Sequence, residues 1–205
     1  MAMNALTTLY LVGFLAGRLL RIPHFRRLRR EGAAVVSDRL ALRHMPPVER
    51  RLGFLTLLGI LILPLVHAFT PWLDFASYRL PPAAGVLGAA ILVVSLWLPW
   101  KARRDLGHNL RFTAAPTAPA MNQSVVTVGA YRYIRHPIMA SLWLQAVAQA
   151  LLVQNWIAGL SGLVLLLPLH WYRVRAEEQD LLERFGDEYR RYMERTGRVI
   201  PILWR

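Results

Sequence analysis

The amino-acid sequence predicts an all-α, polytopic membrane protein with five transmembrane helices. Hydrophobic residues make up 55% of its 205 residues and charged residues only 18%, which is more typical of an integral membrane protein than of a large soluble core. Five apolar segments approach the length that crosses a bilayer, and the basic residues gather between them on alternate sides. A chain of this length is enough for one domain.

The five apolar segments are expected to be the spanning helices. At about 1.5 Å of rise per residue, the last two are slightly short for a hydrocarbon layer of about 30 Å, so a tight helical hairpin with little tilt is expected. Prolines open the third and fourth segments, where a missing N–H has no cost, and Pro64 is expected to kink the second. The segments are Ala5 to Leu20, Leu52 to Phe69, Ala83 to Trp100, Ile138 to Val153 and Trp156 to Tyr172.

The basic residues predict the orientation. Residues 18–51 hold ten Arg, residues 70–82 hold one, residues 101–137 hold six Lys or Arg, and residues 173–205 hold eight. Because cytoplasmic loops are enriched in Lys and Arg, the N-terminus is expected outside and the C-terminus in the cytoplasm. A compact chain of this kind suggests a bacterial inner membrane.

The chain divides into two regions. Residues 1–100 contain the first three predicted spans and a basic cytoplasmic loop, and residues 101–205 contain a polar loop, the last two spans and amphipathic cytoplasmic helices. Glu177 to Phe185 continues the fifth span out of the membrane, and Gly186 separates it from a second short helix, Asp187 to Arg195.

Charge and composition also exclude several functions. The formal net charge of +13 would suggest nucleic acid for a soluble protein, but basic residues that flank apolar spans are better explained by anionic lipid headgroups. The sequence has no cysteine, which excludes disulfides, thiolate metal sites and cysteine nucleophiles. No spacing of His, Asp and Glu suggests a metal site, and Gly129 stands alone, so a Rossmann dinucleotide site is not expected. We expect neither nucleic acid nor metal as a partner.

A basic and aromatic loop, Gly129 to Pro137, is the first candidate for chemistry. His136 precedes a proline, which favours an extended backbone, and the helix that begins behind it offers free N–H groups and a partial positive charge. Such a loop could hold an adenosine and a carboxylate. A juxtamembrane anchor in contact with lipid headgroups explains it equally well. Its other polar and aromatic side chains are Tyr131, Arg132, Tyr133 and Arg135.

Arg173, Glu177 and Glu178 form the second candidate cluster. A carboxylate near the bilayer surface can bind an amino group, a ribose hydroxyl or a sulfonium, and an arginine can bind an anionic substrate group. Taken alone, a solvated i,i+4 ion pair worth a few tenths of a kcal/mol is the better interpretation. A hairpin of the last two spans, however, returns Glu177 to the side of the membrane where His136 lies, and we expect the active site there.

Three polar residues of the fourth segment, Ser141, Gln145 and Gln149, are spaced four apart and share one helix face. Polar side chains in a membrane usually face the bundle interior. An interhelical hydrogen-bond seam is favoured here over a substrate-lining role.

Taken together, four segments resemble the isoprenylcysteine carboxyl methyltransferase family and its phospholipid N-methyltransferase relatives. The resemblance covers about residues 101–205, and the order and spacing of the motifs make it specific. The segments are Val125-Val-Thr-Val-Gly-Ala-Tyr-Arg-Tyr-Ile-Arg-His-Pro137, Arg173-Val-Arg-Ala-Glu-Glu178, Phe185-Gly-Asp-Glu-Tyr189 and Arg198-Val-Ile-Pro201.

The resemblance implies an integral membrane enzyme that transfers a methyl group from S-adenosylmethionine to a lipophilic or lipidated acceptor from the bilayer. An isoprenylcysteine-like carboxylate is the first expectation, and a lipid amine or a thiol is the next. It implies that Arg173 orients the acceptor's anionic group. The cofactor site would be lined by Val125, Val126, Tyr131, His136 and Pro137, with Glu177 binding the cofactor and Glu178 beside it.

The sequence departs from the family pattern twice, and two other functions stay open. Met139 stands where the family usually has tyrosine, which bears on cofactor packing, and Leu110-Arg111 stands where it often has Trp-Ser, which bears on the acceptor. Sterol-reductase-type membrane enzymes share a similar Arg-His-Pro and Arg-Glu-Glu layout and bind NADPH, but they are larger and have extra spans. The third possibility is a non-enzymatic membrane protein whose loops only anchor it.

Overall fold

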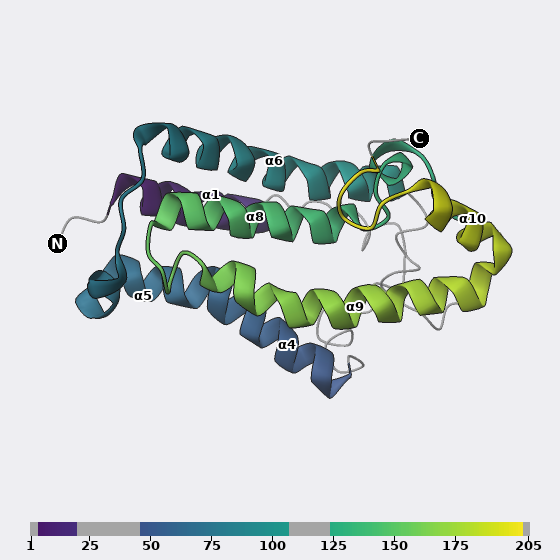
Figure 1. Ribbon diagram of the computed structural model, residues 1–205, viewed down its shortest axis with the longest axis horizontal. Helices are drawn as coiled ribbons and strands as arrows, with labels where there is room; N and C mark the ends of the chain where they lie inside the picture. The colour runs from purple at the N-terminus through teal and green to yellow at the C-terminus, as the bar shows by residue number, and fades with distance from the viewer. Residues whose placement is uncertain (1–3, 20–45, 107–123, 203–205) are drawn as a thin grey trace.

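The long helices lie side by side along the long axis of the molecule, and a short helix, α10 (Asp187–Arg195), lies at one end (Figure 1). The computed structural model describes residues 4–19, 46–106 and 124–202. Within these ranges the chain is helical, with two isolated backbone bridges and no β-strand, which confirms the predicted all-α class. Most of the predicted basic loop after the first segment, and Leu110-Arg111, lie outside the described residues.

Helices form close to the predicted apolar segments. The first, third and fourth segments begin within one residue of their predicted starts, and the third continues past Trp100 to Leu106. The remaining elements are α1 (Ala5–Leu19), α4 (Pro47–Leu57), a π-helical turn η1 (Leu58–Ile62), α5 (Leu63–Phe69), the 3-10 turn η2 (Pro71–Ala76), α6 (Pro82–Leu106), the 3-10 turn η4 (Gly129–Arg132), α8 (Pro137–Val153) and α9 (Ser161–Phe185).

Two helical rods among the described residues are long and apolar enough to cross a membrane: Pro47–Phe69, of 23 residues, and Pro82–Leu106, of 25 residues. Only 22% and 28% of their apolar stretches are buried within the molecule. The core helix of a soluble protein would be mostly buried, so their outward apolar faces favour a lipid environment. α1 and α8 are apolar but shorter.

Pro64 is accommodated by the π-helical turn η1 that precedes it. Proline has no N–H for the carbonyl of Ile60, four residues earlier, and the hydroxyl of Tyr10 donates a 2.7 Å hydrogen bond to this carbonyl instead. The carbonyl of Gly59 accepts hydrogen bonds of 2.8 Å each from Gln149 and Ser161. The proline therefore exposes backbone acceptors that tie this rod to α1, α8 and α9.

Gln149 lies at the centre of a buried polar seam, as the sequence predicts. Besides Gly59, its amide donates to the carbonyl of Ala158 at 2.6 Å, and its Oε1 accepts from Tyr10 at 3.0 Å. The two other polar residues of this face differ: the Ser141 hydroxyl bonds to Ile138 of its own helix, and Gln145 faces a cavity. One of the three residues thus forms the predicted interhelical seam.

The turn between α8 and α9 is longer than predicted. Gln154 adopts a left-handed conformation, with φ of 48°, and ends α8 as expected. α9 then begins at Ser161 rather than at Trp156, because the Asn155 side chain accepts hydrogen bonds from the backbone N–H groups of Ile157 and Ala158. This side chain holds the intervening residues in a turn that docks on η2 through Leu73.

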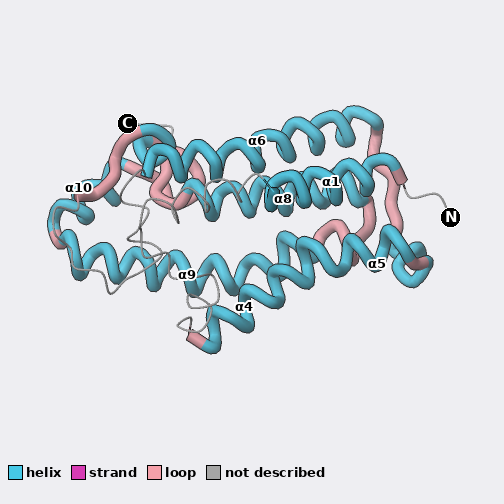
Figure 2. Tube along the Cα trace, turned by 180° about the vertical axis from the view of Figure 1, so that it is seen from behind, coloured by secondary structure: helices cyan, strands magenta, loops and turns pink. Residues whose placement is uncertain are grey.

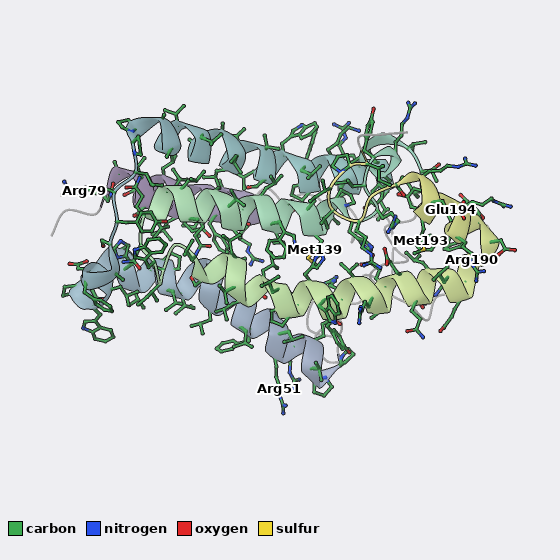
Figure 3. All side chains as sticks on the ribbon, in the orientation of Figure 1. Arg51, Arg79, Met139, Arg190, Met193 and Glu194 are labelled. Atoms are coloured by element: carbon green, nitrogen blue, oxygen red, sulfur yellow. The ribbon has the colours of Figure 1, made fainter. Side chains whose placement is uncertain are left out.

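α8 and α9 run antiparallel and pack along much of their length (Figure 1). Met139, at the start of α8, packs against residues of α9, and Figure 3 shows it between the two helices. The Trp143 indole donates a 3.1 Å hydrogen bond to His170. This pairing brings the start of α8 next to the second half of α9, where the two candidate clusters meet.

Candidate functional site

The loop before α8 is anchored on the C-terminal end of α6. Gly129 has a positive φ of 61°, and a Cβ there would lie 2.2 Å from the carboxylate of Asp105, so glycine alone fits. That carboxylate accepts a 2.8 Å hydrogen bond from the backbone N–H of Ala130 and pairs with Lys101. Tyr131 packs beside this anchor against Ala102.

The C-terminal segment after α10 fixes the other side of the loop. The backbone N–H groups of Arg135 and His136 donate to the carbonyls of Gly197 and Arg198, at 2.8 and 2.9 Å. The Tyr192 hydroxyl donates a 2.6 Å hydrogen bond to the carbonyl of Tyr131. Figure 2 shows these loop segments at the same end of the molecule as α10. The loop is therefore held between α6 and the end of the chain.

His136 lies buried between two carboxylates of α9. Its Nδ1 is 3.6 Å from Oε2 of Glu177, and its Nε2 is 3.4 Å from Oε1 of Glu178. Burial lowers the pKa of His136, but hydrogen bonds to the two glutamates and their charges outweigh burial, so the pKa is raised overall. Carboxylates at both ring nitrogens favour the doubly protonated imidazolium. The two segments meet at one site, as the sequence predicts.

Glu178 is enclosed by cationic partners. Its side chain is 5% exposed and accepts hydrogen bonds from Nε of Arg135 at 3.0 Å and Nη2 of Arg198 at 2.9 Å. Arg135 also donates to the carbonyls of Met193 and Thr196. Burial raises the pKa of Glu178, but its hydrogen bonds to His136 and the two arginines lower it to about 2. Both oxygens of Glu178 thus join the loop to the C-terminal segment.

Glu177 is the accessible carboxylate of the site. Its side chain is 38% exposed, and His136 contacts only one of its oxygens. Burial raises the pKa of Glu177, but the hydrogen bond and charge of His136 and the charge of Arg173 lower it by more. The pKa of Glu177 is therefore lowered overall. A partly exposed carboxylate, held in place by a buried imidazolium, is suited to a cationic or hydroxyl-bearing ligand.

Arg173 has a different partner from the one its spacing suggests. Its Nη1 lies 3.5 Å from Oε1 of Glu49, at the start of α4, whereas Glu177 pairs with His136. The solvated i,i+4 pair considered from the sequence is therefore replaced by contacts to other segments, α4 for Arg173 and the His-Pro loop for Glu177. Half of the Arg173 side chain remains exposed, so its guanidinium is accessible to a ligand.

The other predicted cofactor residues surround the loop. The backbone N–H of Val125 donates a 3.3 Å hydrogen bond to Glu188, and Val126 packs against the cluster that contains Tyr131. Pro137 is fully buried at the start of α8. Val126 and Tyr131 thus lie on the α6 side of the loop, while Glu177 and Glu178 lie on its α9 side.

Three residues with contacts at this site have no role predicted from the sequence: Glu49, Tyr189 and Arg198. Tyr189 is 2% exposed, and its hydroxyl has no hydrogen-bond partner among the described residues. Burial and the charge of Glu178 both raise its pKa. Tyr189 and Arg198 belong to quoted motifs, but partners on other segments cannot be read from one stretch of sequence.

Arg173 also lies on the wall of a cavity of about 670 Å³. The cavity lies among α1, α4, η1, α6, α8 and α9 and has a largely apolar lining, with Leu57, Leu96 and Leu142 among its residues. Glu177 follows Arg173 by one helical turn on α9. In the described part of the chain, no group of three His, Asp or Glu side chains is arranged to hold a metal ion.

Comparison with known proteins identifies the family. The model of the phospholipid methyltransferase family matches residues 83–188, from the start of α6 into α10. The chain belongs to this family. This confirms the resemblance found in its motifs, since the match covers the loop, the antiparallel helices and both glutamates.

Curated relatives agree with this assignment of the phospholipid methyltransferase family. The chain is 30% identical over 79 residues to protein-S-isoprenylcysteine O-methyltransferase of Schizosaccharomyces pombe, covering 38% of this chain and 34% of that protein. Against the protein of the same name from Saccharomyces cerevisiae it is 28% identical over 141 residues, or 68% and 59% of the two chains. Methanethiol S-methyltransferase of Pseudomonas deceptionensis is 27% identical over 130 residues, or 58% and 48%. The chain thus spans roughly a third to three fifths of these relatives.

Proposed function

We propose that this protein is an integral membrane methyltransferase that uses S-adenosylmethionine and acts on a lipophilic acceptor. A carboxylate of the isoprenylcysteine kind is the first candidate acceptor, and a thiol or lipid amine is the second. The observation that carries the proposal is the accessible carboxylate of Glu177, held by the buried ring of His136 within the family-matched region. The names of the relatives support both the reaction class and the first acceptor.

The proposed membrane arrangement has five spans, the last two forming a hairpin. The alternating directions of α1, the α4–α5 rod, α6, α8 and α9 support it (Figure 1). Arg79 lies at the end opposite α10, which carries Arg190 (Figure 3). With basic residues inside, the α10 end faces the cytoplasm, and membrane lipids surround the rods. The compact chain favours a bacterial inner membrane, and we assign the protein to one.

The residues of the site fit S-adenosylmethionine by their donor and acceptor chemistry. Glu177 offers an anionic acceptor for an amino group, a ribose hydroxyl or the sulfonium. The hydroxyl of Tyr189, buried beside the glutamates, has no hydrogen-bond partner within residues 4–19, 46–106 and 124–202, and a polar ligand would satisfy it. α8 begins at Pro137 without a side-chain cap, so its N-terminal N–H groups suit a carboxylate. We assign Val125, Val126, Tyr131, His136, Pro137 and Glu177 to the cofactor, with Glu178 as their support.

When bound, S-adenosylmethionine supplies a methyl group on a positively charged sulfur, which keeps the bonding electrons as a neutral thioether when the acceptor takes the methyl. His136 holds Glu177 in place, and Glu177 would bind the positively charged part of the cofactor. Arg173 orients the anionic group of the acceptor, and the apolar cavity beside it excludes water. Alignment and exclusion of water are what such a displacement requires, and a carboxylate or thiolate acceptor needs no general base.

Calorimetry on the detergent-solubilised protein tests the proposal. We expect heat on titration with S-adenosylhomocysteine and none with NADPH. Glu177→Gln and His136→Ala should each weaken the binding at least tenfold, because a charge-assisted contact is lost or misplaced. Glu183→Gln, an exposed change on the same helix, should leave the affinity unchanged.

The other outcomes identify the alternatives. Heat with NADPH alone would favour a membrane reductase of the sterol-reductase type. Absence of binding for both nucleotides would favour a non-enzymatic membrane protein. Full affinity for S-adenosylhomocysteine in both variants would put the cofactor site elsewhere.

A further inference from the structure

The cavity beside Arg173 combines an apolar interior with an excess of positive charge. Its volume of about 670 Å³ is within the range of small-molecule sites, about 300–1,000 Å³. Each of the surrounding helices contributes hydrophobic side chains to its wall. They include Phe14, Leu57, Ile60, Leu96, Leu142 and Leu169.

Four arginines line the same cavity: Arg18, Arg103, Arg104 and Arg173. Only Arg173 has a carboxylate partner within ion-pair distance in the described part of the chain, which is Glu49. Arg18 and Arg104 lie over the rings of Phe14 and Trp100, at 5.0 and 4.7 Å from their centroids. The lining therefore carries uncompensated positive charge, which suits an anionic ligand.

Arg103 is the best placed of these arginines to bind an anion inside the cavity. It is half-buried, unlike the exposed Arg104 next to it. Its Nη1 donates a 3.2 Å hydrogen bond to the carbonyl of Pro99, one turn earlier on α6, which fixes one edge of the guanidinium. The remaining donors have no protein acceptor among the described residues, and a carboxylate or phosphate would accept from them.

We propose that this cavity binds a single-chain amphiphile with an anionic head group, a carboxylate or a phosphate, and that Arg103 selects the charge. The chain of the ligand lies along the leucines, and its head group lies at the arginines. That this ligand is the methyl acceptor rests on the proposed function, because Arg173 joins the cavity wall to the turn that carries Glu177. The binding itself does not rest on it.

Part of this site lies outside the family-matched residues 83–188. α1 and α4 contribute Phe14, Gly17, Gly53 and Thr56 to the lining. Gly53 is notable because a Cβ built there meets no atom within 4 Å. A larger side chain at this position can enter open space without a clash, which allows the cavity to be narrowed on purpose.

Binding of four amphiphiles that share a twelve-carbon chain tests the charge preference. Dodecyl phosphate, dodecanoate, dodecanol and dodecyltrimethylammonium are titrated into the full chain in a non-ionic detergent without cofactor. We expect the phosphate or the carboxylate to bind at least tenfold more tightly than the alcohol and the cation. The ratio of the affinities for dodecyl phosphate and dodecanoate identifies the preferred head group.

Two pairs of variants localise the binding. Arg103→Gln should weaken the binding of the anions about tenfold, the effect of one charge-assisted hydrogen bond, and leave the binding of dodecanol unchanged. Arg79→Gln, at the opposite end of the molecule, should change neither affinity. Gly53→Leu should weaken all bound amphiphiles. Gly53→Ala also removes the glycine but adds only one carbon, and should bind nearly as the wild type does.

Equal affinity for anionic and cationic probes, or an anion preference that is undiminished in Arg103→Gln, would overturn the charge assignment. Unchanged binding in Gly53→Leu, with its fold intact by thermal unfolding, would put the ligand outside this cavity. If anions bind as expected but S-adenosylhomocysteine does not, the proposed function fails and the amphiphile site stands. The reverse result rejects the cavity as the site of an anionic acceptor and leaves the cofactor site standing.

Discussion

Glu177 and Glu178 are adjacent in sequence but have different tasks in the structure. Glu178 is buried among Arg135, Arg198 and His136, whereas the Glu177 side chain is 38% exposed. The Glu-Glu pair could be predicted to lie opposite the His-Pro loop. The sequence could not predict which of the two glutamates is buried in the protein. The partners of Glu178 include Arg198, which reaches it only after the chain has turned at Gly186 and passed through α10.

Glu178→Gln should strongly destabilise the protein. The change leaves the buried guanidinium of Arg135 and the half-exposed guanidinium of Arg198 without their anion, and it removes one of the two carboxylates at His136. Breaking a buried ion pair costs about 3–5 kcal/mol. Thermal unfolding in detergent, followed by circular dichroism, should give a lower midpoint for this variant. Glu177→Gln is the matched control, and a similar loss of stability in both variants would contradict the distinct roles.

The stability contributed by His136 should depend on pH. Its folded pKa is raised above the ordinary value of 6.5, so its contribution is fully present below pH 6.5 and is lost as the pH rises through the folded pKa. The difference in unfolding free energy between the wild type and His136→Gln should therefore shrink above pH 6.5. A difference that grows with pH would contradict the imidazolium assignment.

Glu178 has the opposite pH dependence. Its pKa is lowered from 4.5 to about 2, so its contribution is present above pH 4.5 and is lost as the pH falls towards 2. Unfolding free energies measured from pH 6 down to pH 3 should decline for the wild type and stay flatter for Glu178→Gln. A parallel decline in both proteins would contradict an ionised, buried Glu178.

At the scale of the elements, the apolar pattern predicts where helices form better than where they end. α8 follows its segment closely, because Pro137 starts it and Gln154 ends it. The start of α9 was predicted five residues too early, at Trp156. The residues before Ser161 are apolar, and hydrophobicity alone does not reveal that Asn155 binds their backbone in a turn.

The rod formed by α4, η1 and α5 depends on Tyr10 as well as on its own sequence. Tyr10→Phe removes the donor to the carbonyl of Ile60, for which Pro64 has no N–H. An unpaired buried carbonyl costs about 1–3 kcal/mol. We expect a lower thermal midpoint for this variant, whereas Tyr133→Phe, at an exposed site, should unfold as the wild type does. Equal midpoints for all three proteins would show that the carbonyl finds another donor.

At the scale of the whole molecule, the distribution of Arg along the chain predicts which end faces the cytoplasm. Because the sequence has no cysteine, single cysteines can report the orientation directly. Arg79→Cys should react with an impermeant maleimide added outside intact cells, and Arg190→Cys only after the membrane is opened. Both positions are exposed and lie at opposite ends of the molecule (Figure 3). Labelling of both from the same side would contradict the five-span arrangement.

The sequence could predict that the His-Pro loop and the Glu177-Glu178 pair meet. It could not predict that the C-terminal segment packs against the loop. A hairpin of apolar helices returns Glu177 to the level of His136, and this follows from segment lengths. The docking of the C-terminal segment on the loop depends on backbone contacts of Gly197 and Arg198, for which local sequence gives no signal. The cavity likewise depends on side chains from several helices.

The central claim is that the carboxylate of Glu177, held by His136, binds a charged nucleoside at the cytoplasmic end of the helices. An experimental structure of the full chain with S-adenosylhomocysteine tests it most directly. The account predicts the ligand against the His-Pro loop, with its amino group or a ribose hydroxyl within hydrogen-bond distance of Glu177. A ligand bound away from both Glu177 and His136 would contradict it.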